Sequence, residues 1–442
     1  MASDLVVPVA RITNLREHPK ASLLGLANIL GYQVVVGLVE DPKGLIWRQF
    51  VKGKLDEKGK RIPVSEGTPG VGHFTEDRDG NKTSVPEGDI EDIMFSFQHK
   101  EGELIVYVPA DTVLTDEWAE MFSVKPLLRS GNRVGKIALR GEPSFGLVVK
   151  LPDGVDWKEG DNVAEYFGCK KYEPPVRATA GDAAPRDSDI DPYFDKFTDI
   201  QNLRLFVDVF KPGEEVVVTE KLEGTNCRLG YINGHQVAGS MEVRRKRPTK
   251  LVGEADDRKD VDLDVDDPEF KRNTYWFPWS VPGVDSLLAA VDDPARASLR
   301  NNIADALLDE GKPKTRRVVE LFGEVYGSSI QKGFKYDAGG GLGFRAFGLK
   351  INDKFLDWEL FEFICREFGV PMVPVLYDGP FDIKAVLDLA EGPTTIGEAP
   401  LREGIVVYPK EERIDPRVGR AVLKGHGYGY SLLKGRSDSR DV

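Results

Sequence analysis

A stretch poor in large apolar residues interrupts the chain near its middle and limits the possible architectures. Its sequence, RATAGDAAPRDSDIDP at residues 177–192, is rich in Ala, Asp and Pro, which is typical of linkers. The whole chain has 442 residues, which is too long for one ordinary hydrophobic core. We therefore predict two domains, at residues 1–176 and 193–442, joined by this linker.

The first domain is predicted to be mostly β. The runs YQVVVGLVE and LIVYVPADTVL are short and rich in β-branched residues, and IALRGEPSFGLVVKLP resembles two strands around a Gly/Pro turn. Short strands with this punctuation are typical of a small barrel or sandwich.

The second domain mixes strand-like and helical periods. VVVTEKLEGTNCRLGYI reads as a strand, a turn and a strand, whereas FLDWELFEFICREFG reads as a helix that ends at Gly369. Residues 251–315 include an acidic stretch low in apolar residues, and we expect an insertion there. The pattern predicts an α+β fold with antiparallel sheets and flanking helices.

Composition narrows the class of protein. The net charge of -13 argues against coating nucleic acid by bulk attraction, although a local basic groove is compatible with it. The three cysteines are scattered and form no metal-type pair, which favours a reducing, cytoplasmic setting. We expect no signal peptide and no membrane span, because no apolar run is long enough.

The segment EKLEGTN places Lys221 after a strand-like run and before a glycine. A Lys-x-x-Gly pattern alone carries little weight: with 46 glycines in the chain it occurs by chance, and Lys250 and Lys424 match it too. What distinguishes Lys221 is the series of motifs that follows it in order.

That series resembles the covalent nucleotidyltransferases, and within them the ATP-dependent RNA ligases. EKLEGTN is similar to their first motif and FGEVYGSSIQKGFKY to the third. FRAFGLKI, REGIVVYP and RAVLKGHGYGYSLLKG resemble the motifs that follow. The resemblance covers most of residues 193–442 and implies an ATP-grasp-like ligase adenylation domain.

The first domain carries a second resemblance. ARITNLREHPKASLLGLANILGYQVVV is similar to the start of OB-type tRNA-binding domains. An OB-like β-barrel ahead of a nucleotidyltransferase resembles the Deinococcus-type RNA ligases, which seal nicks that carry a ribonucleotide 3′-hydroxyl. The implied partner is RNA or a nicked RNA/DNA hybrid duplex, bound by residues 1–176.

The resemblance implies a reaction in which Lys221 attacks the α-phosphorus of ATP and forms lysyl-AMP. An ordinary lysine has a pKa of about 10.4, so this amine needs nearby positive charge or burial to become nucleophilic. Mg²⁺ or Mn²⁺ on the phosphates and a second lysine, Lys424, would supply that charge. Glu403 would bind the metal or orient Lys221.

Three residues around the nucleophile take roles by the same resemblance. Glu220 would accept a hydrogen bond from the adenine amino group, Gly224 would allow a tight turn beside the nucleotide, and Asn226 would contact the phosphate of the activated end. A surface carboxylate at Glu220 and a self-bonding turn at Asn226 are the structural alternatives. The role of Glu223 stays open.

Two further positions have named rivals. Glu324 is the expected acceptor for a ribose hydroxyl, and Glu320 lies four residues earlier on the same strand face. Phe347 is expected to stack on adenine, and Phe344 is close to it in sequence.

The basic run after the first motif supplies a phosphate contact. Arg244, with Ser240, falls where the resemblance places this residue, and Arg245 and Arg247 compete for the role because an arginine can grip phosphate with two parallel bonds. In the fifth motif the family often has a second lysine, where this chain has His426; Lys434 is the alternative replacement.

Other functions stay open at this stage. A GTP-using capping-type transferase would share the lysine chemistry, but capping enzymes and DNA ligases carry an OB domain after the fifth motif, and this sequence ends soon after it. A non-catalytic RNA-binding protein with a decayed transferase domain would explain His426. Our preferred interpretation is a monomeric RNA ligase that seals 3′-OH/5′-phosphate nicks.

Overall fold

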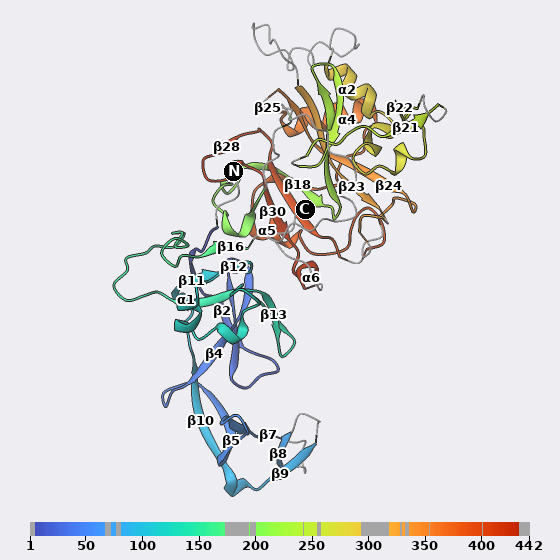
Figure 1. The fold of residues 1–442 in the computed structure, drawn as a ribbon. Coiled ribbons are helices and arrows are strands. Elements are labelled where there is room, and N and C mark those ends of the chain that lie inside the picture. The colour runs from blue at the N-terminus through green and yellow to red at the C-terminus, as the bar shows by residue number, and fades with distance from the viewer. Residues whose placement is uncertain are drawn as a thin grey trace. The chain divides into compact units, whose positions relative to one another are not determined.

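The chain divides into two compact units. In the computed structural model an N-terminal unit spans residues 4–172, and a C-terminal unit spans 173–442 together with residues 1–3 (Figure 1). The structure describes residues 5–66, 72–76, 81–172, 194, 200–241, 243–253, 258–292, 318–327, 329–331, 336–352, 354–399 and 401–432. The predicted linker, 177–192, lies outside the described residues.

The N-terminal unit consists of several small antiparallel sheets. A three-stranded sheet has the order β1 (Val9–Arg11), β11 (Leu104–Val108) and β15 (Leu147–Lys150). A six-stranded sheet has the order β2 (Thr13–Glu17), β3 (Leu24–Ile29), β4 (Tyr32–Glu40), β10 (Ile90–Phe97), β5 (Ile46–Leu55) and β6 (Arg61–Pro63). The smaller sheets are β7 (Ser65–Glu66) with β8 (His73–Glu76) and β9 (Lys82–Val85), β12 (Thr112–Val113) with β16 (Lys170–Lys171), and β13 (Lys136–Leu139) with β14 (Glu142–Phe145).

The expected OB-like barrel is not confirmed. Within the described part of the unit the strands stay divided between these sheets and do not close into a barrel. A core of buried apolar side chains, among them Val9, Val106 and Phe167, packs the three-stranded sheet against helix α1 (Asp116–Met121). A second cluster around Phe50 and Phe95 joins the long strands β5 and β10, so the unit has more than one core.

The C-terminal unit has the predicted mixture of antiparallel strands and helices. One five-stranded sheet has the order β17 (Gln201–Asn202), β30 (Leu423–His426), β27 (Gly404–Pro409), β18 (Glu215–Lys221) and β26 (Val375–Pro380). The other has the order β20 (His235–Gly239), β19 (Thr225–Ile232), β23 (Val318–Gly327), β24 (Leu342–Ile351) and β25 (Lys354–Phe355). Two hairpins, β21 (Thr249–Val252) with β22 (Lys259–Asp262) and β28 (Ile414–Asp415) with β29 (Gly419–Arg420), complete the strands described for this unit.

Helices and one large core hold the two sheets together. The helices are α2 (Val284–Asp292), α4 (Trp358–Phe368), α5 (Ile383–Asp388) and α6 (Tyr428–Ser431). Helix α4 ends where predicted, because Gly369 adopts a left-handed conformation with φ 67° that a glycine accepts without strain. The core joins Val217 and Tyr408 of the first sheet to Leu229 of the second and Leu287 of α2.

Residues 258–292 fall within the expected insertion and are folded against the second sheet. Trp279 donates a hydrogen bond from its indole nitrogen to the carbonyl of Val237 at 3.2 Å, and Leu287 and Leu288 of α2 are fully buried. This segment therefore belongs to the core of the unit. Within the described ranges, no helix is both long enough and apolar enough to cross a bilayer.

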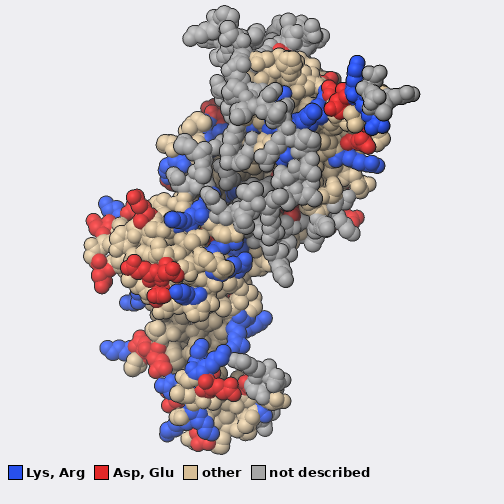
Figure 2. Space-filling view, viewed as in Figure 1, with Lys and Arg blue, Asp and Glu red and all other residues tan. Residues whose placement is uncertain are grey.

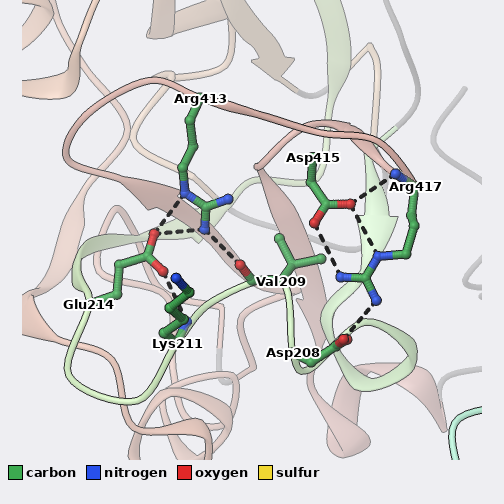
Figure 3. A network of polar contacts seen from close by, with 7 residues as sticks. All are labelled: Asp208, Val209, Lys211, Glu214, Arg413, Asp415 and Arg417. Atoms are coloured by element: carbon green, nitrogen blue, oxygen red, sulfur yellow. Dashed lines mark hydrogen bonds and ion pairs between the residues drawn. The ribbon is translucent and has the colours of Figure 1, made fainter.

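Charged pairs tie the entry to β18 to the hairpin that follows β27. Arg413 donates two hydrogen bonds to one oxygen of Glu214, at 2.9 and 2.7 Å, and a third to the carbonyl of Val209 (Figure 3). Arg417 joins Asp208, at 2.7 Å, to Asp415. We call these pairs the far-end network, because they lie at the end of β18 opposite Lys221.

Candidate active site

Three neighbouring strands bring the predicted catalytic residues into register. Lys221 is the last residue of β18 and pairs with Gly404 of β27, which in turn pairs with His426 of β30. Directly paired residues of antiparallel strands point to the same face of a sheet. Lys221 and His426 therefore share one face, and Lys424, two residues before His426, shares it as well.

Lys221 forms a buried ion pair with Glu403. The Nζ–Oε1 distance is 3.0 Å, and the two side chains are 14% and 5% exposed. Glu403 directly precedes β27, and its carbonyl accepts a hydrogen bond from the Gly427 N–H at 3.0 Å. A Cβ on Gly404 would lie 2.1 Å from the carbonyl oxygen of Gly425, so this position needs a glycine for the two strands to approach.

The ion pair raises the pKa of Lys221, whereas the sequence led us to expect a lowered pKa. Burial lowers the pKa of Lys221, but the charges of Glu403 and Glu324 outweigh burial and raise it above its ordinary value. Burial raises the pKa of Glu403, but Lys221 and His426 lower it below its ordinary value. The carboxylates of the site thus favour the charged form of Lys221, contrary to the expected depression of its pKa.

The residue that differs from the family's fifth motif, His426, lies inside the site. His426 is buried, and its Nε2 lies 3.5 Å from the same Glu403 oxygen that receives Lys221. The ring of Tyr430 stacks on it with centroids 6.0 Å apart and planes at 15°. Lys434, the alternative replacement, lies outside the described residues.

Lys424 lies on the same face of the sheet as Lys221, two residues further along the strands. It pairs with Val406 of β27, and Val406 pairs with Thr219 of β18. Only 4% of Lys424 is exposed. A buried ammonium two residues along the sheet from Lys221 is suitably placed for an anionic ligand over this face.

The second sheet contributes Glu324 and Asn226, which are directly paired across β23 and β19. Burial raises the pKa of Glu324 to about 8, with Lys221 opposing and Glu403 and Glu223 reinforcing the shift. The structure thus brings Glu324 into the electrostatic range of both Lys221 and Glu403.

Gly224 lies against Glu324. A Cβ at position 224 would come within 2.4 Å of the Val325 carbonyl oxygen and 2.9 Å of the Glu324 Cγ. At this position the backbone therefore approaches β23 too closely for any side chain. This close approach gives a structural reason for the glycine of EKLEGTN.

Two buried oxygens of the site have no hydrogen-bond partner within the described part of the chain. They are the Oε2 of Glu403 and the Oδ1 of Asn226. Buried polar atoms are nearly always satisfied in folded proteins, so such exceptions point to a ligand, an ion or water.

The carboxylate oxygens of the site suit a hard cation that takes its other ligands from substrate phosphates and water. Among the described residues, no group of three or more His, Cys, Asp or Glu side chains is arranged to hold a metal. Mg²⁺ is commonly bound by one or two carboxylates together with substrate phosphates and water. The free oxygen of Glu403 fits that pattern.

Glu220 points to the opposite face of β18 from Lys221. It is 1% exposed, and its carboxylate accepts hydrogen bonds from Thr394 Oγ1 at 2.5 Å, Thr395 N at 2.8 Å and Thr395 Oγ1 at 2.6 Å. This carboxylate fastens the loop that leads to Glu403 onto the nucleophile strand. Its predicted contact with adenine stays a prediction.

Glu320, the rival of Glu324, has a different role. Its fully buried carboxylate lies 3.7 Å from Arg228 and 3.5 Å from Lys350. Arg228 in turn donates to the carbonyls of Phe194 and Met241 at 3.3 Å. Glu320 thus neutralises a structural arginine, which leaves Glu324 as the carboxylate near the nucleophile.

Phe347 and Phe344 also differ. The register between β23 and β24 shifts so that Phe322 pairs with Gly348 and Gly323 with Ala346, which leaves Phe347 at a bulge. Bulges re-aim a side chain, and Phe347 is only half-buried. Phe344 is buried against Gly323, where a Cβ would lie 2.3 Å from its ring.

The three arginines of the basic run also differ in their surroundings. Arg247 donates to Gln236 at 2.6 Å and lies over the rings of Phe270 and Trp276. Arg245 is buried beside Tyr275. Arg244 is half-buried. Of the three arginines, the two rivals pack against aromatic rings, and the predicted phosphate contact of Arg244 stays untested.

Three residues of this site had no signal in the sequence. Thr394 and Thr395 lie in EGPTTIGEAP, which reads as an ordinary loop. Tyr336 accepts the Glu223 N–H at 3.0 Å, and it is brought there by a β-bridge to Gly397. These are long-range contacts, which neither spacing nor composition encodes.

The segment that forms the site matches a known protein family. Residues 214–426 match the family model described as RNA ligase, and the match includes every paired strand of the site. This segment is therefore similar to RNA ligase domains. No curated protein gives a sequence match.

Solved structures of an RNA ligase share the fold of this chain over nearly its full length. An apo mutant of the Naegleria gruberi RNA ligase is 17% identical with a TM-score of 0.57, and the match covers 98% of each chain. A mutant of the same ligase with ATP and Mn is 16% identical with a TM-score of 0.57, covering 97% of this chain and 98% of that one. At this identity the likeness establishes the fold alone, and it extends over both units.

Proposed function

We propose that the chain is an ATP-dependent RNA ligase that joins a 3′-hydroxyl to a 5′-phosphate through a lysyl-AMP intermediate. The observation that carries the proposal is the convergence of Lys221 with two buried carboxylates, Glu403 and Glu324, inside the matched segment. Structures of the Naegleria ligase with ATP and Mn support ATP and a divalent metal as the cofactors.

In the first step the Nζ of Lys221 attacks the α-phosphorus of ATP, a P–N bond forms, and pyrophosphate leaves. The ammonium must lose a proton before it can attack. Mg²⁺ or Mn²⁺, held in part by the free oxygen of Glu403, would supply positive charge beside the phosphates. Glu403 positions the amine at 3.0 Å, and Lys424 offers charge to the α-phosphate from the same face.

In the later steps the AMP passes to the 5′-phosphate of a polynucleotide, and the 3′-hydroxyl then displaces it. Asn226, with its unpartnered Oδ1, and Arg244 would contact the activated end. Glu324 would accept a hydrogen bond from a ribose hydroxyl, and Phe347 would stack on the adenine face. Glu220 would have to exchange a bond from Thr394 or Thr395 for one from the adenine amino group.

The N-terminal unit would bind the nucleic acid, in the role of an OB-like module. Its proposed substrate is RNA or a nicked RNA/DNA hybrid duplex, which it would hold for the ligase domain. Deleting a binding unit should affect the sealing of ends far more than the reaction of Lys221 with ATP.

A labelling experiment tests the proposed function directly. The protein is incubated with α-labelled ATP or GTP and Mn²⁺, denatured, and examined for a covalent adduct. We expect labelling by ATP and not by GTP. Labelling by GTP alone would indicate a capping-type transferase, and no adduct with either nucleotide would indicate a non-catalytic RNA-binding protein.

The substrate is defined by a second assay. Nicked duplexes with ribo- or deoxyribonucleotides on each side of the nick are compared for joining. We expect sealing to require a ribonucleotide 3′-hydroxyl. Efficient joining of nicks made only of DNA would contradict the assignment as an RNA ligase.

A further inference from the structure

Two exposed cations lie on neighbouring loops of the N-terminal unit that are distant in sequence. Lys20 follows β2, and Arg140 occupies the turn between β13 and β14. A Cβ built on Gly141 would lie 3.7 Å from the Nζ of Lys20, so the ammonium reaches the neighbour of Arg140. The two neighbouring loops therefore each carry one exposed cation.

One buried histidine fixes this arrangement. The Lys20 N–H donates to the Nδ1 of His18 at 3.0 Å, and the Nε2 of His18 lies 2.9 Å from the carbonyl oxygen of Leu139. Because Nδ1 accepts, Nε2 carries the hydrogen and donates to Leu139. His18 is 5% exposed, and both of its nitrogens are used to join the two loops.

The turn itself holds an unusual residue. Leu139 pairs with Glu142, and the two residues between them have positive φ angles, 50° for Arg140 and 89° for Gly141. Such two-residue turns favour Asn-Gly, because asparagine and glycine tolerate this conformation better than residues with long side chains. The turn therefore places the exposed side chain of Arg140 at the tip of the β13–β14 hairpin.

Neither cation is used inside the unit. Within the described residues, no hydrogen bond or ion pair involves the side chain of Lys20 or Arg140. The adjoining carboxylate, Glu142, accepts from Gln33 at 3.1 Å. Both side chains are exposed, so they are available to a partner.

We propose that Lys20 and Arg140 form a phosphate-binding site for the backbone of the RNA substrate. The inference deepens the proposed function and rests on it for the identity of the nucleic acid. Figure 2 shows Lys and Arg interspersed with Asp and Glu on the visible surface, and the chain carries a net charge of -13. Binding must therefore use local groups of cations, and His18 holds the two loops that carry this pair next to each other.

The test uses the full chain with two neutralising substitutions, Lys20→Gln and Arg140→Asn. Asparagine suits the left-handed turn, so the second change removes a charge without disturbing the hairpin. The matched control is Lys52→Gln with Lys54→Gln, which removes two exposed cations from β5 of the same unit. Binding of a nicked RNA duplex is titrated at several salt concentrations, and self-adenylylation and thermal unfolding are measured alongside.

We expect the Lys20/Arg140 variant to bind the duplex more weakly whatever its sequence. The slope of log K against log salt should fall by about 0.9 for each lost phosphate contact. Self-adenylylation and the unfolding temperature should match those of the wild type. Wild-type affinity and slope in the variant, or an equal loss in the control, would overturn the inference, whereas absence of an adduct in the wild type would overturn the proposed function instead.

Discussion

The two ends of strand β18 handle their charges in opposite ways. At the far end, Arg413 and Arg417 satisfy Glu214, Asp208 and Asp415 through short contacts at partly exposed positions. At the other end, the Lys221–Glu403 pair is buried and leaves one Glu403 oxygen without a hydrogen-bond partner in the described structure.

This difference separates structure from function on a single strand. A buried polar group without a hydrogen-bond partner costs about 1–3 kcal/mol, and more if the group is charged. Such a group therefore does not serve the stability of the fold. The C-terminal unit keeps such a group beside Lys221 and pairs the charges of the far-end network. We infer that the nucleophile end awaits a ligand that completes its interactions.

The largest expected effect is the loss of the covalent adduct on removal of the amine. Lys221→Ala should give no adduct with ATP, because the substitution removes the amine that forms the P–N bond, while circular dichroism should show an intact fold. Lys211→Ala, an exposed lysine at the opposite end of β18, is the control and should label normally. An adduct of ordinary yield in Lys221→Ala would refute the nucleophile.

A smaller but large effect is expected at Glu403. Glu403→Gln keeps the shape but removes the charge that orients Lys221, and adenylylation should slow on the order of 100-fold. Single-turnover rates measure this step alone. Glu214→Gln, the matched change at the far end, should lose stability and keep the rate; equal slowing of both variants would erase the distinction between the two ends.

Glu324 should make the stability of the protein depend on pH. Its pKa is about 8 in the folded protein against an ordinary value of 4.5, so the folded state holds the proton more tightly. The stabilisation is complete below about pH 4.5 and is lost as the pH rises through about 8. Compared with Glu324→Gln, the wild type should therefore lose thermal stability between these values; parallel curves of Tm against pH would contradict the shift.

The smallest effect is expected within the far-end network. Arg413→Ala should lower the free energy of unfolding by about 1 kcal/mol, because partly exposed ion pairs contribute little. Denaturant titration measures the loss, which should shrink in high salt. Adenylylation should be unchanged, and a slower rate would mean that this end of β18 also supports the chemistry.

Much of the site could be predicted from the sequence because its residues lie on strands. Lys221, Lys424 and Glu324 lie on strands and Glu403 directly precedes one, and strand pairing makes them neighbours. The helix before Gly369 could be predicted for the same kind of reason, since its end is encoded locally.

The remainder depends on contacts between distant segments. The sequence could not show that Thr394 and Thr395 would hold Glu220, or that Glu320 would neutralise Arg228. The raised pKa of Lys221 results from carboxylates on two sheets, so it too follows only from the assembled fold. The expected barrel is not confirmed, because strand content does not specify closure.

The site of the adduct tests the central claim most directly. The protein is incubated with ATP and Mn²⁺, digested, and mapped by mass spectrometry for a peptide that carries AMP. The account predicts AMP on the side chain of Lys221, joined by an acid-labile P–N bond. AMP on any other residue, or release of pyrophosphate with Lys221 unmodified throughout, would contradict it.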